Sequence, residues 1–242
     1  RKQKFDIDDE ELKPYFQLDK VQEAVFGLAG KLFGLEFKEI NDVQKYHSDV
    51  KTYEVSEVGS QKSEVSSELQ SSDFQHPTSD YKALLYTDYH PRKGKRAGAW
   101  MTSYKNQYKK DGENSRPHIS VVCNFTKPTK DTPSLLTFQE VTTLFHEFGH
   151  ALHGVLADTQ YPNLSGTSVK WDFVELPSQF LENYCYEPEF LKTFAKHYQT
   201  GEILQEEKMG SLLAQTRKYH GGIKHVLKSM NLHIVIKESK LE

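Results

Sequence analysis

The sequence predicts an α+β fold that is mainly helical, with a small sheet preceding a long amphipathic helix. Short runs rich in β-branched and aromatic residues, separated by turn residues, occupy much of 35–125 and are typical of strands. From residue 137 onward, apolar residues recur at three- and four-residue intervals, which is the period of helices packed on a core. With 242 residues, the chain is long enough for one large domain.

One helix and five strands are predicted in the first half of the chain. Apolar residues recur at helical spacing through 18–33, and Gly34 is well placed as a C-terminal cap. Residues 56–80 are rich in Ser, Glu and Gln with little apolar periodicity, which predicts a flexible insertion. Strands are expected at 35–40, 50–55, 83–89, 96–101 and 118–125.

The second half begins with a helix-start signal. Thr137 is followed three residues later by Glu140, which is a capping-box signature, so a helix should begin near Phe138. A second helical stretch is expected around 172–186, with Pro177 at its start or at a kink. Others are expected near 188–198 and 203–219.

Composition argues against several classes of partner. The chain contains no apolar run of about eighteen residues, so no membrane span is predicted. The net charge of −3 gives no electrostatic reason to expect nucleic acid or an anionic membrane surface. The densest basic cluster, Arg92, Lys93, Lys95 and Arg96, lies among turn residues, where we expect a solvated loop.

Cysteine usage and the first residues bear on the cellular compartment. Cys123 and Cys185 lie far apart without a CxxC pattern, which argues against a disulfide framework and is compatible with a reducing compartment. The first residues are charged and lack the apolar segment of a signal peptide. We expect a cytoplasmic protein, and a periplasmic or secreted parent stays open because residue 1 is not Met.

The stretch FHEFGHALHG, residues 145–154, contains the candidate metal ligands and a candidate base. On a helical wheel its apolar residues form one stripe, and His146 and His150 lie opposite that stripe, one turn apart. Two imidazoles at this spacing can both reach one Zn²⁺ ion. The neighbouring Glu147 can reach the water on that metal and act as general base. The pattern therefore predicts a zinc site with its own base.

A catalytic zinc site needs a third protein ligand and one open position. One candidate is His153, one turn beyond the second histidine. The other candidates are Glu175 and Glu182 in the next helical stretch, with Asp172 one turn before Glu175. Spacing does not decide between the two glutamates, so both stay open on the residues alone.

The sequence around these residues resembles the thimet oligopeptidase family of zinc metallopeptidases, most of all its bacterial branch of peptidyl-dipeptidases and oligopeptidase A. The resemblance covers most of 1–55 and 81–220, with its motifs in family order and spacing. The stretches that carry it are LFHEFGHALHG (144–154), LSGTSVKWDFVELPSQFLENY (164–184), HYQTG (197–201), YTDYHPRKGKRAGAWM (86–101) and HISVVCNFTKP (118–128).

The resemblance implies a zincin-like catalytic domain and a role for each site residue. His146 and His150 match the zinc histidines of the family, and Glu175 matches the third ligand of one Zn²⁺ per chain. Glu147 matches the general base. The match decides against Glu182 and His153 as ligands, and it implies a packing or outer-shell place for His153.

Two further roles stay open. Asp172 either holds a ligating histidine in the right tautomer or is a simple acid at a helix start. The strand 118–125 either offers its edge to an extended peptide or is buried within the sheet.

The implied activity is zinc-dependent hydrolysis of peptide bonds in short oligopeptides. We favour release of C-terminal dipeptides, as in peptidyl-dipeptidases, and an endo-acting oligopeptidase is the alternative. The expected partners are short peptide substrates, with no nucleic acid and no membrane, and we expect a monomer.

The sequence also departs from the family. Residues 56–80 replace a short connection, and residues 221–242 leave the family pattern. Family enzymes have a helical region upstream and a downstream loop whose His and Tyr stabilise the oxyanion; Tyr219 to Gly222 offer these residue types too early in the chain. We therefore expect 1–242 to form a partial catalytic domain. A fragment that binds zinc but is catalytically impaired is the second hypothesis.

Overall fold

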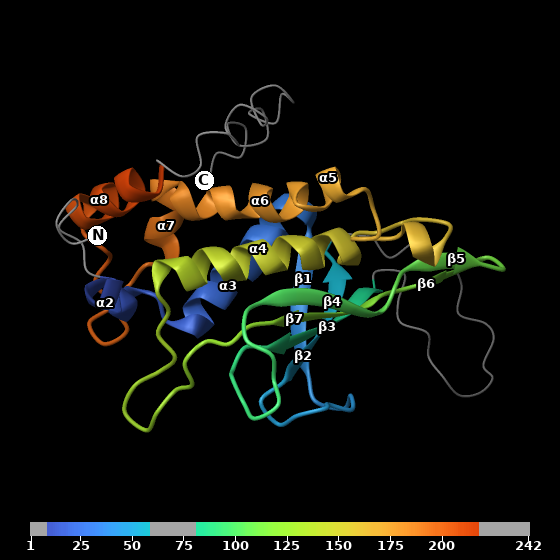
Figure 1. The fold of residues 1–242 in the computed structure, drawn as a ribbon, viewed down its shortest axis with the longest axis horizontal. Coiled ribbons are helices and arrows are strands. Elements are labelled where there is room, and N and C mark those ends of the chain that lie inside the picture. Colours follow the sequence, from blue (N-terminus) through green and yellow to red (C-terminus); the bar gives the residue numbers. More distant parts are fainter. Residues whose placement is uncertain (1–8, 59–80, 218–242) are drawn as a thin grey trace.

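The computed structural model describes residues 9–58 and 81–217, and it shows a mixed α+β architecture (Figure 1). Most of the expected insertion at 56–80 lies outside the described residues, as do 221–242 and the stretch from Tyr219 to Gly222. The division of the chain into a partial catalytic domain with these two departures therefore stays a prediction. Within the two described ranges, none of the helices combines the length and apolar character needed to cross a membrane.

Five strands form the main sheet, in the order β1-β2-β3-β7-β4. The strands are β1 (Leu35–Ile40), β2 (Lys51–Glu57), β3 (Tyr81–Asp88), β4 (Trp100–Lys105) and β7 (His118–Val122). Neighbours run antiparallel except β3 and β7, which are parallel. The sheet precedes the histidine-bearing helix in sequence, as predicted.

Strand β7 lies between β3 and β4, so the hypothesis that 118–125 offers a free edge to a peptide is wrong. The physical reason is visible in its burial. Four successive residues from Ile119 to Val122 are buried, which means that both faces of this strand are covered. The edge strand beside β7 is β4, whose start at Trp100 falls later than the predicted 96–101.

The helices and the second sheet complete the described chain. Gly34 caps α3 as predicted, and its N–H bonds to the carbonyl of Gly30. The expected helix at 172–186 is divided into α5, α6 and a 3₁₀ turn, with Pro177 in the first turn of α6. The elements are α2 (Asp9–Leu12), α3 (Leu18–Phe33), α4 (Phe138–Val155), α5 (Trp171–Val174), α6 (Leu176–Glu182), α7 (Pro188–Phe194), α8 (Glu206–Arg217) and the hairpin of β5 (Tyr108–Lys110) and β6 (Glu113–Ser115).

The β5–β6 hairpin was not predicted, although the sequence contains its signal. Its two-residue turn is Asp111-Gly112, and both residues have positive φ, 53° and 84°. Asp-Gly is a preferred pair for such a turn because both positions tolerate this conformation.

Helix α4 is the central element, with the sheet on one side and α6 on the other (Figure 1). It begins at the predicted capping box: the Thr137 hydroxyl accepts from the backbone N–H of Glu140, and the Glu140 carboxylate accepts from the N–H of Thr137. Its apolar stripe is buried in the core, including Phe145 and Phe148. The predicted division of α4 into a buried apolar face and an opposite face is therefore confirmed. The opposite face is turned toward α6.

The two helices approach closely because α4 has a glycine at the crossing. A Cβ atom placed on Gly149 would lie 2.5 Å from the Cα of Ser178 and 2.6 Å from the carbonyl oxygen of Pro177. Both of these atoms belong to the α6 backbone, which cannot rotate aside. Glycine is thus required by packing in the middle of the HEFGH stretch.

The basic loop after β3 is only partly solvated, which corrects the prediction for 90–96. Arg92 makes two hydrogen bonds to the Asp88 carboxylate, at 2.7 and 2.8 Å. The Lys95 ammonium bonds to the same carboxylate at 2.9 Å and to three backbone carbonyls. Both the Asp88 and Lys95 side chains are almost fully buried. Asp88, at the end of β3, pairs with both cations, and Lys95 also bonds to the carbonyl of Cys123, 28 residues further along the chain.

We expect Gly149→Ala to destabilise the fold. Its methyl group would collide with the backbone of Ser178, and overpacking of this kind typically costs about 1–3 kcal/mol of unfolding free energy. Gly154→Ala is the comparison variant, since the three atoms nearest to its methyl would all belong to the side chains of Ile119 and Met101, which can shift more easily than backbone. Denaturant unfolding measures both variants. Equal stability of the two would contradict the close contact.

We expect Asp88→Asn to destabilise the protein by about 3–5 kcal/mol near neutral pH, because the buried Lys95 charge loses its partner. Burial raises the pKa of Asp88, but hydrogen bonds from Arg92 and Lys95 outweigh it and hold that pKa below its usual range. The carboxylate therefore stabilises the fold above the usual aspartate pKa of about 3.9, and the difference between variant and wild type should shrink as pH falls through the depressed folded-state value.

Asp49→Asn provides the control for this measurement. Asp49 pairs with Lys127 at 2.5 Å, but the lysine side chain is 47% exposed. An exposed pair contributes only about 0–1 kcal/mol. Urea unfolding across a pH series compares the two variants, and an equally small effect of both would show that the buried cluster does not stabilise the fold.

Candidate metal centre

Two predicted ligands on α4 and one on the next helical stretch come together in the structure. His146 Nε2 lies 3.2 Å from Glu175 Oε2, and His150 Nε2 lies 3.3 Å from the same oxygen. The two imidazole Nε2 atoms are 3.2 Å apart. These are the three residues of the described chain whose donor atoms gather within reach of one metal ion.

Each ligand has a local structural reason for its position. His146 and His150 lie one turn apart on the face of α4 that looks toward α6, so their rings point the same way. Glu175 lies at the junction of α5 and α6. The buried Ser178 hydroxyl donates to Glu175 Oε2 at 2.8 Å and so orients the carboxylate. Ser178 was not predicted, because its role depends on this junction.

The three donors fit a zinc ion. Tetrahedral zinc with nitrogen and oxygen ligands at about 2.0–2.1 Å keeps those ligands about 3.3–3.4 Å from one another. The observed separations of 3.2 and 3.3 Å are close to this. Two imidazoles and one carboxylate are also the ligand set of a catalytic site that keeps one position open.

Glu147 is the buried acid beside this group. Its side chain comes from the same helix, and only 8% of the residue is exposed. The backbone of Met101, on the edge strand β4, lies near its carboxylate. Burial raises the pKa of Glu147, and the charge of His146 and the Met101 backbone lower that pKa without cancelling the effect of burial.

The two histidines have different environments. Burial lowers the pKa of His146, but the hydrogen bond and charge of Glu182, with the charges of Glu147 and Glu175, outweigh it and raise the pKa overall. For His150, burial lowers the pKa first, and the neighbouring His146 lowers it further. At neutral pH His150 therefore keeps a lone pair available on its ring.

The other candidates lie outside the donor group. His153 packs its ring edge-on against Phe173, 6.0 Å between centroids. Glu182 contacts the remaining nitrogen of His146, Nδ1, and is not among the three converging donors. Asp172 is exposed in the first turn of α5 and forms no hydrogen bond or ion pair with either histidine in the described chain.

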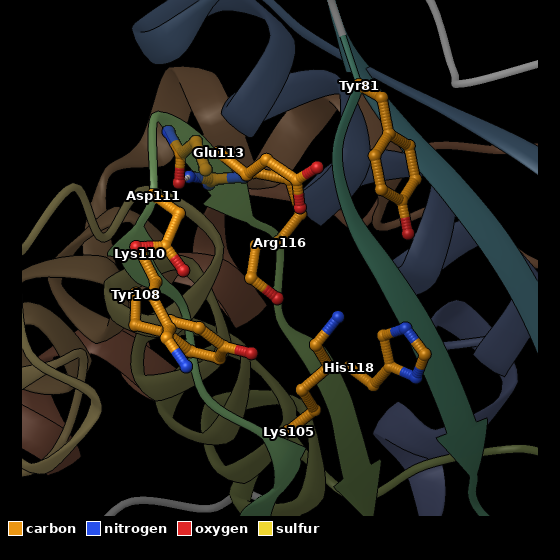
Figure 2. Close-up of a pocket in the computed structure, with 10 residues that line it drawn as sticks. Tyr81, Lys105, Tyr108, Lys110, Asp111, Glu113, Arg116 and His118 are labelled. Carbon is orange, nitrogen blue, oxygen red and sulfur yellow. Dashed lines mark hydrogen bonds between the residues drawn. The ribbon is translucent and has the colours of Figure 1, made fainter.

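A separate cavity of about 860 Å³ lies between the β5–β6 hairpin and the neighbouring ends of β3, β4 and β7 (Figure 2). Figure 2 shows Tyr81 on one side of it, with Lys105 and His118 below. It contains none of the predicted metal ligands. This cavity is therefore separate from the group of three metal-binding donors.

Comparisons with known proteins bear on the same residues. The model of Peptidase family M3 matches residues 1–230. Oligopeptidase A of Escherichia coli is 40% identical over 212 residues, 87% of this chain and 28% of the relative. Dipeptidyl carboxypeptidase of Escherichia coli is 40% identical over 208 residues, 86% of this chain and 28% of the relative. The probable cytosolic oligopeptidase A of Arabidopsis thaliana is 42% identical over 229 residues, 92% and 30% respectively.

The chain spans less than a third of the length of these relatives. The family match nevertheless covers nearly all of it, including the converging His146, His150 and Glu175. The chain therefore belongs to Peptidase family M3, whose members are zinc metallopeptidases.

Proposed function

We propose that this chain hydrolyses peptide bonds in short peptides, using one Zn²⁺ held by His146, His150 and Glu175. The observation that supports the proposal is the triangle of three donor atoms with the buried Glu147 on the same helix. The names of the relatives, oligopeptidase and dipeptidyl carboxypeptidase, point to peptides as the class of substrate.

Zinc held by His146, His150 and Glu175 would supply a Lewis acid, which would polarise the scissile carbonyl and make a water molecule more acidic. The residues of the chain do the rest. Glu147 takes the proton of the attacking water and passes it to the leaving amine. Its burial on α4, beside the three converging donors, places its carboxylate for this role.

The finer proposal is release of C-terminal dipeptides, and endo-cleavage is the alternative. The relatives at 40% identity include both an oligopeptidase and a dipeptidyl carboxypeptidase, so their names do not separate the two. We also propose a monomeric, cytoplasmic protein. One relative is named as cytosolic and another as organellar, which leaves the compartment to direct measurement.

We expect Glu147→Gln to slow peptide hydrolysis about 10²–10⁴-fold while leaving about one zinc per chain. Removing a general base typically costs about 10²–10⁴ in rate, and the amide keeps the size of the side chain. A quenched fluorescent peptide, assayed with and without a zinc chelator, gives the rate, and metal analysis gives the zinc content.

Three outcomes are informative in this assay. Chelator-sensitive cleavage well above the Glu147→Gln level supports the enzyme proposal. About one zinc without such cleavage favours the second hypothesis, a chain that binds zinc but is catalytically impaired. No stoichiometric zinc at all would contradict both.

We expect cleavage to depend on a free C-terminus if the chain acts as a peptidyl-dipeptidase. Two peptides of the same sequence, one with a free carboxylate and one amidated, provide the comparison, with products identified by mass spectrometry. Release of a C-terminal dipeptide from the free peptide, with the amidated one cut far more slowly, supports the finer proposal. Equal cleavage of both at an internal bond supports the endo-acting alternative.

A further inference from the structure

We infer that Glu182 is a positioning residue, which fixes the ring of His146 so that its Nε2 faces the metal site. The inference rests on the proposed zinc site but not on turnover. Glu182 was considered from the sequence only as a metal ligand, and the orienting role was considered for Asp172. In the structure, Glu182 contacts the His146 ring without being among the three donors, and Asp172 is exposed.

The contacts of the His146 ring define the role. Its Nδ1 contacts Glu182 Oε1, while its Nε2 lies 3.2 Å from both Glu175 Oε2 and His150 Nε2. A carboxylate can only accept, so Nδ1 must carry the proton that is shared with it. The lone pair of the neutral ring then lies on Nε2, toward the other donors. One hydrogen bond thereby sets both the tautomer and the direction of the ring.

The position of Glu182 on α6 explains how one helix serves both sides of the ring. Glu175 precedes the first residue of α6 and Glu182 is its last residue, seven positions or about two turns apart. Both therefore face α4, and the glycine at the helix crossing lets α6 approach closely enough. The Glu182 side chain is 16% exposed, against 44% for Glu175. Its bond is thus shielded from solvent, where a charged hydrogen bond is stronger.

The second histidine lacks this arrangement. His150 Nδ1 is buried and has no hydrogen-bond partner among the described residues. The tautomer of His150 is therefore not set by a described carboxylate, and His146 is the ligand whose geometry is fixed before metal binds. Loss of an orienting partner of a metal-ligating histidine typically weakens metal affinity about 10–100-fold.

The first test measures zinc affinity by competition with a chelator of known affinity. We expect Glu182→Gln to weaken zinc binding about 10–100-fold, because an amide accepts a weaker hydrogen bond without charge. Asp172→Asn removes one carboxylate charge from the neighbouring helix and is the matched control. We expect it to change the affinity less than about threefold. Glu182→Asn has a shorter side chain, and we expect it to lower zinc affinity at least as much as Glu182→Gln does.

The competing explanation is that Glu182 only joins α6 to α4. In that case Glu182→Gln would lower the melting temperature of the metal-free protein and weaken zinc binding no more than Asp88→Asn, which destabilises the fold at a cluster away from the metal ligands. An equal effect on zinc affinity in Glu182→Gln and Asp172→Asn would also overturn the inference. Loss of any nearby negative charge would then explain the weaker binding.

A second measurement does not depend on a variant that folds. Ring ¹⁵N chemical shifts of His146 in the metal-free wild type, at a pH where the imidazole is neutral, report which nitrogen carries the proton. We expect the proton on Nδ1 for His146. A predominant proton on Nε2 would overturn the inference even if the peptidase assay succeeds. Conversely, a chain that binds zinc with the expected tautomer but cleaves nothing would refute only the proposed function.

Discussion

The close contact of α4 and α6 at Gly149 is the constraint on which the metal centre depends. Helix α4 contributes His146, Glu147 and His150, but the histidines alone offer only two ligands. The third arrives at the start of α6 and the partner of His146 at its end. A side chain at the crossing would separate the helices, and both glutamates would move together, because they belong to one rigid element.

The other side of α4 is held by the sheet, which provides a second and independent support. The edge strand β4 packs against α4, and the backbone of Met101 lies near Glu147. The loop that leads into β4 is tied to the end of β3 by the buried Asp88–Lys95 cluster. The ligands are thus placed by a helix–helix contact and the base by a helix–sheet contact. A perturbation of one contact need not disturb the other.

The sequence predicted what is local and missed what depends on tertiary pairing. The capping box, the apolar stripe of α4 and the histidine spacing lie within one helix, where periodicity is informative. The residues alone could not choose between Glu175 and Glu182, because the choice depends on how α6 lies against α4. The family resemblance favoured Glu175, which the structure places among the donors. The burial of Lys95, which bonds to the carbonyl of Cys123, and the place of β7 between β3 and β4 both depend on segments distant in sequence.

The charges at the centre link metal binding to folding. Three carboxylates, Glu147, Glu175 and Glu182, surround two imidazoles at the α4–α6 contact, and each acid is a source of the raised pKa of His146. Without a cation this arrangement concentrates negative charge where two helices must pack. A divalent ion offsets that charge and bonds to residues from both elements. Because the converging ligands require the folded contact, metal binding stabilises the folded state over the unfolded one by mass action. The site and the helix contact are therefore one cooperative unit.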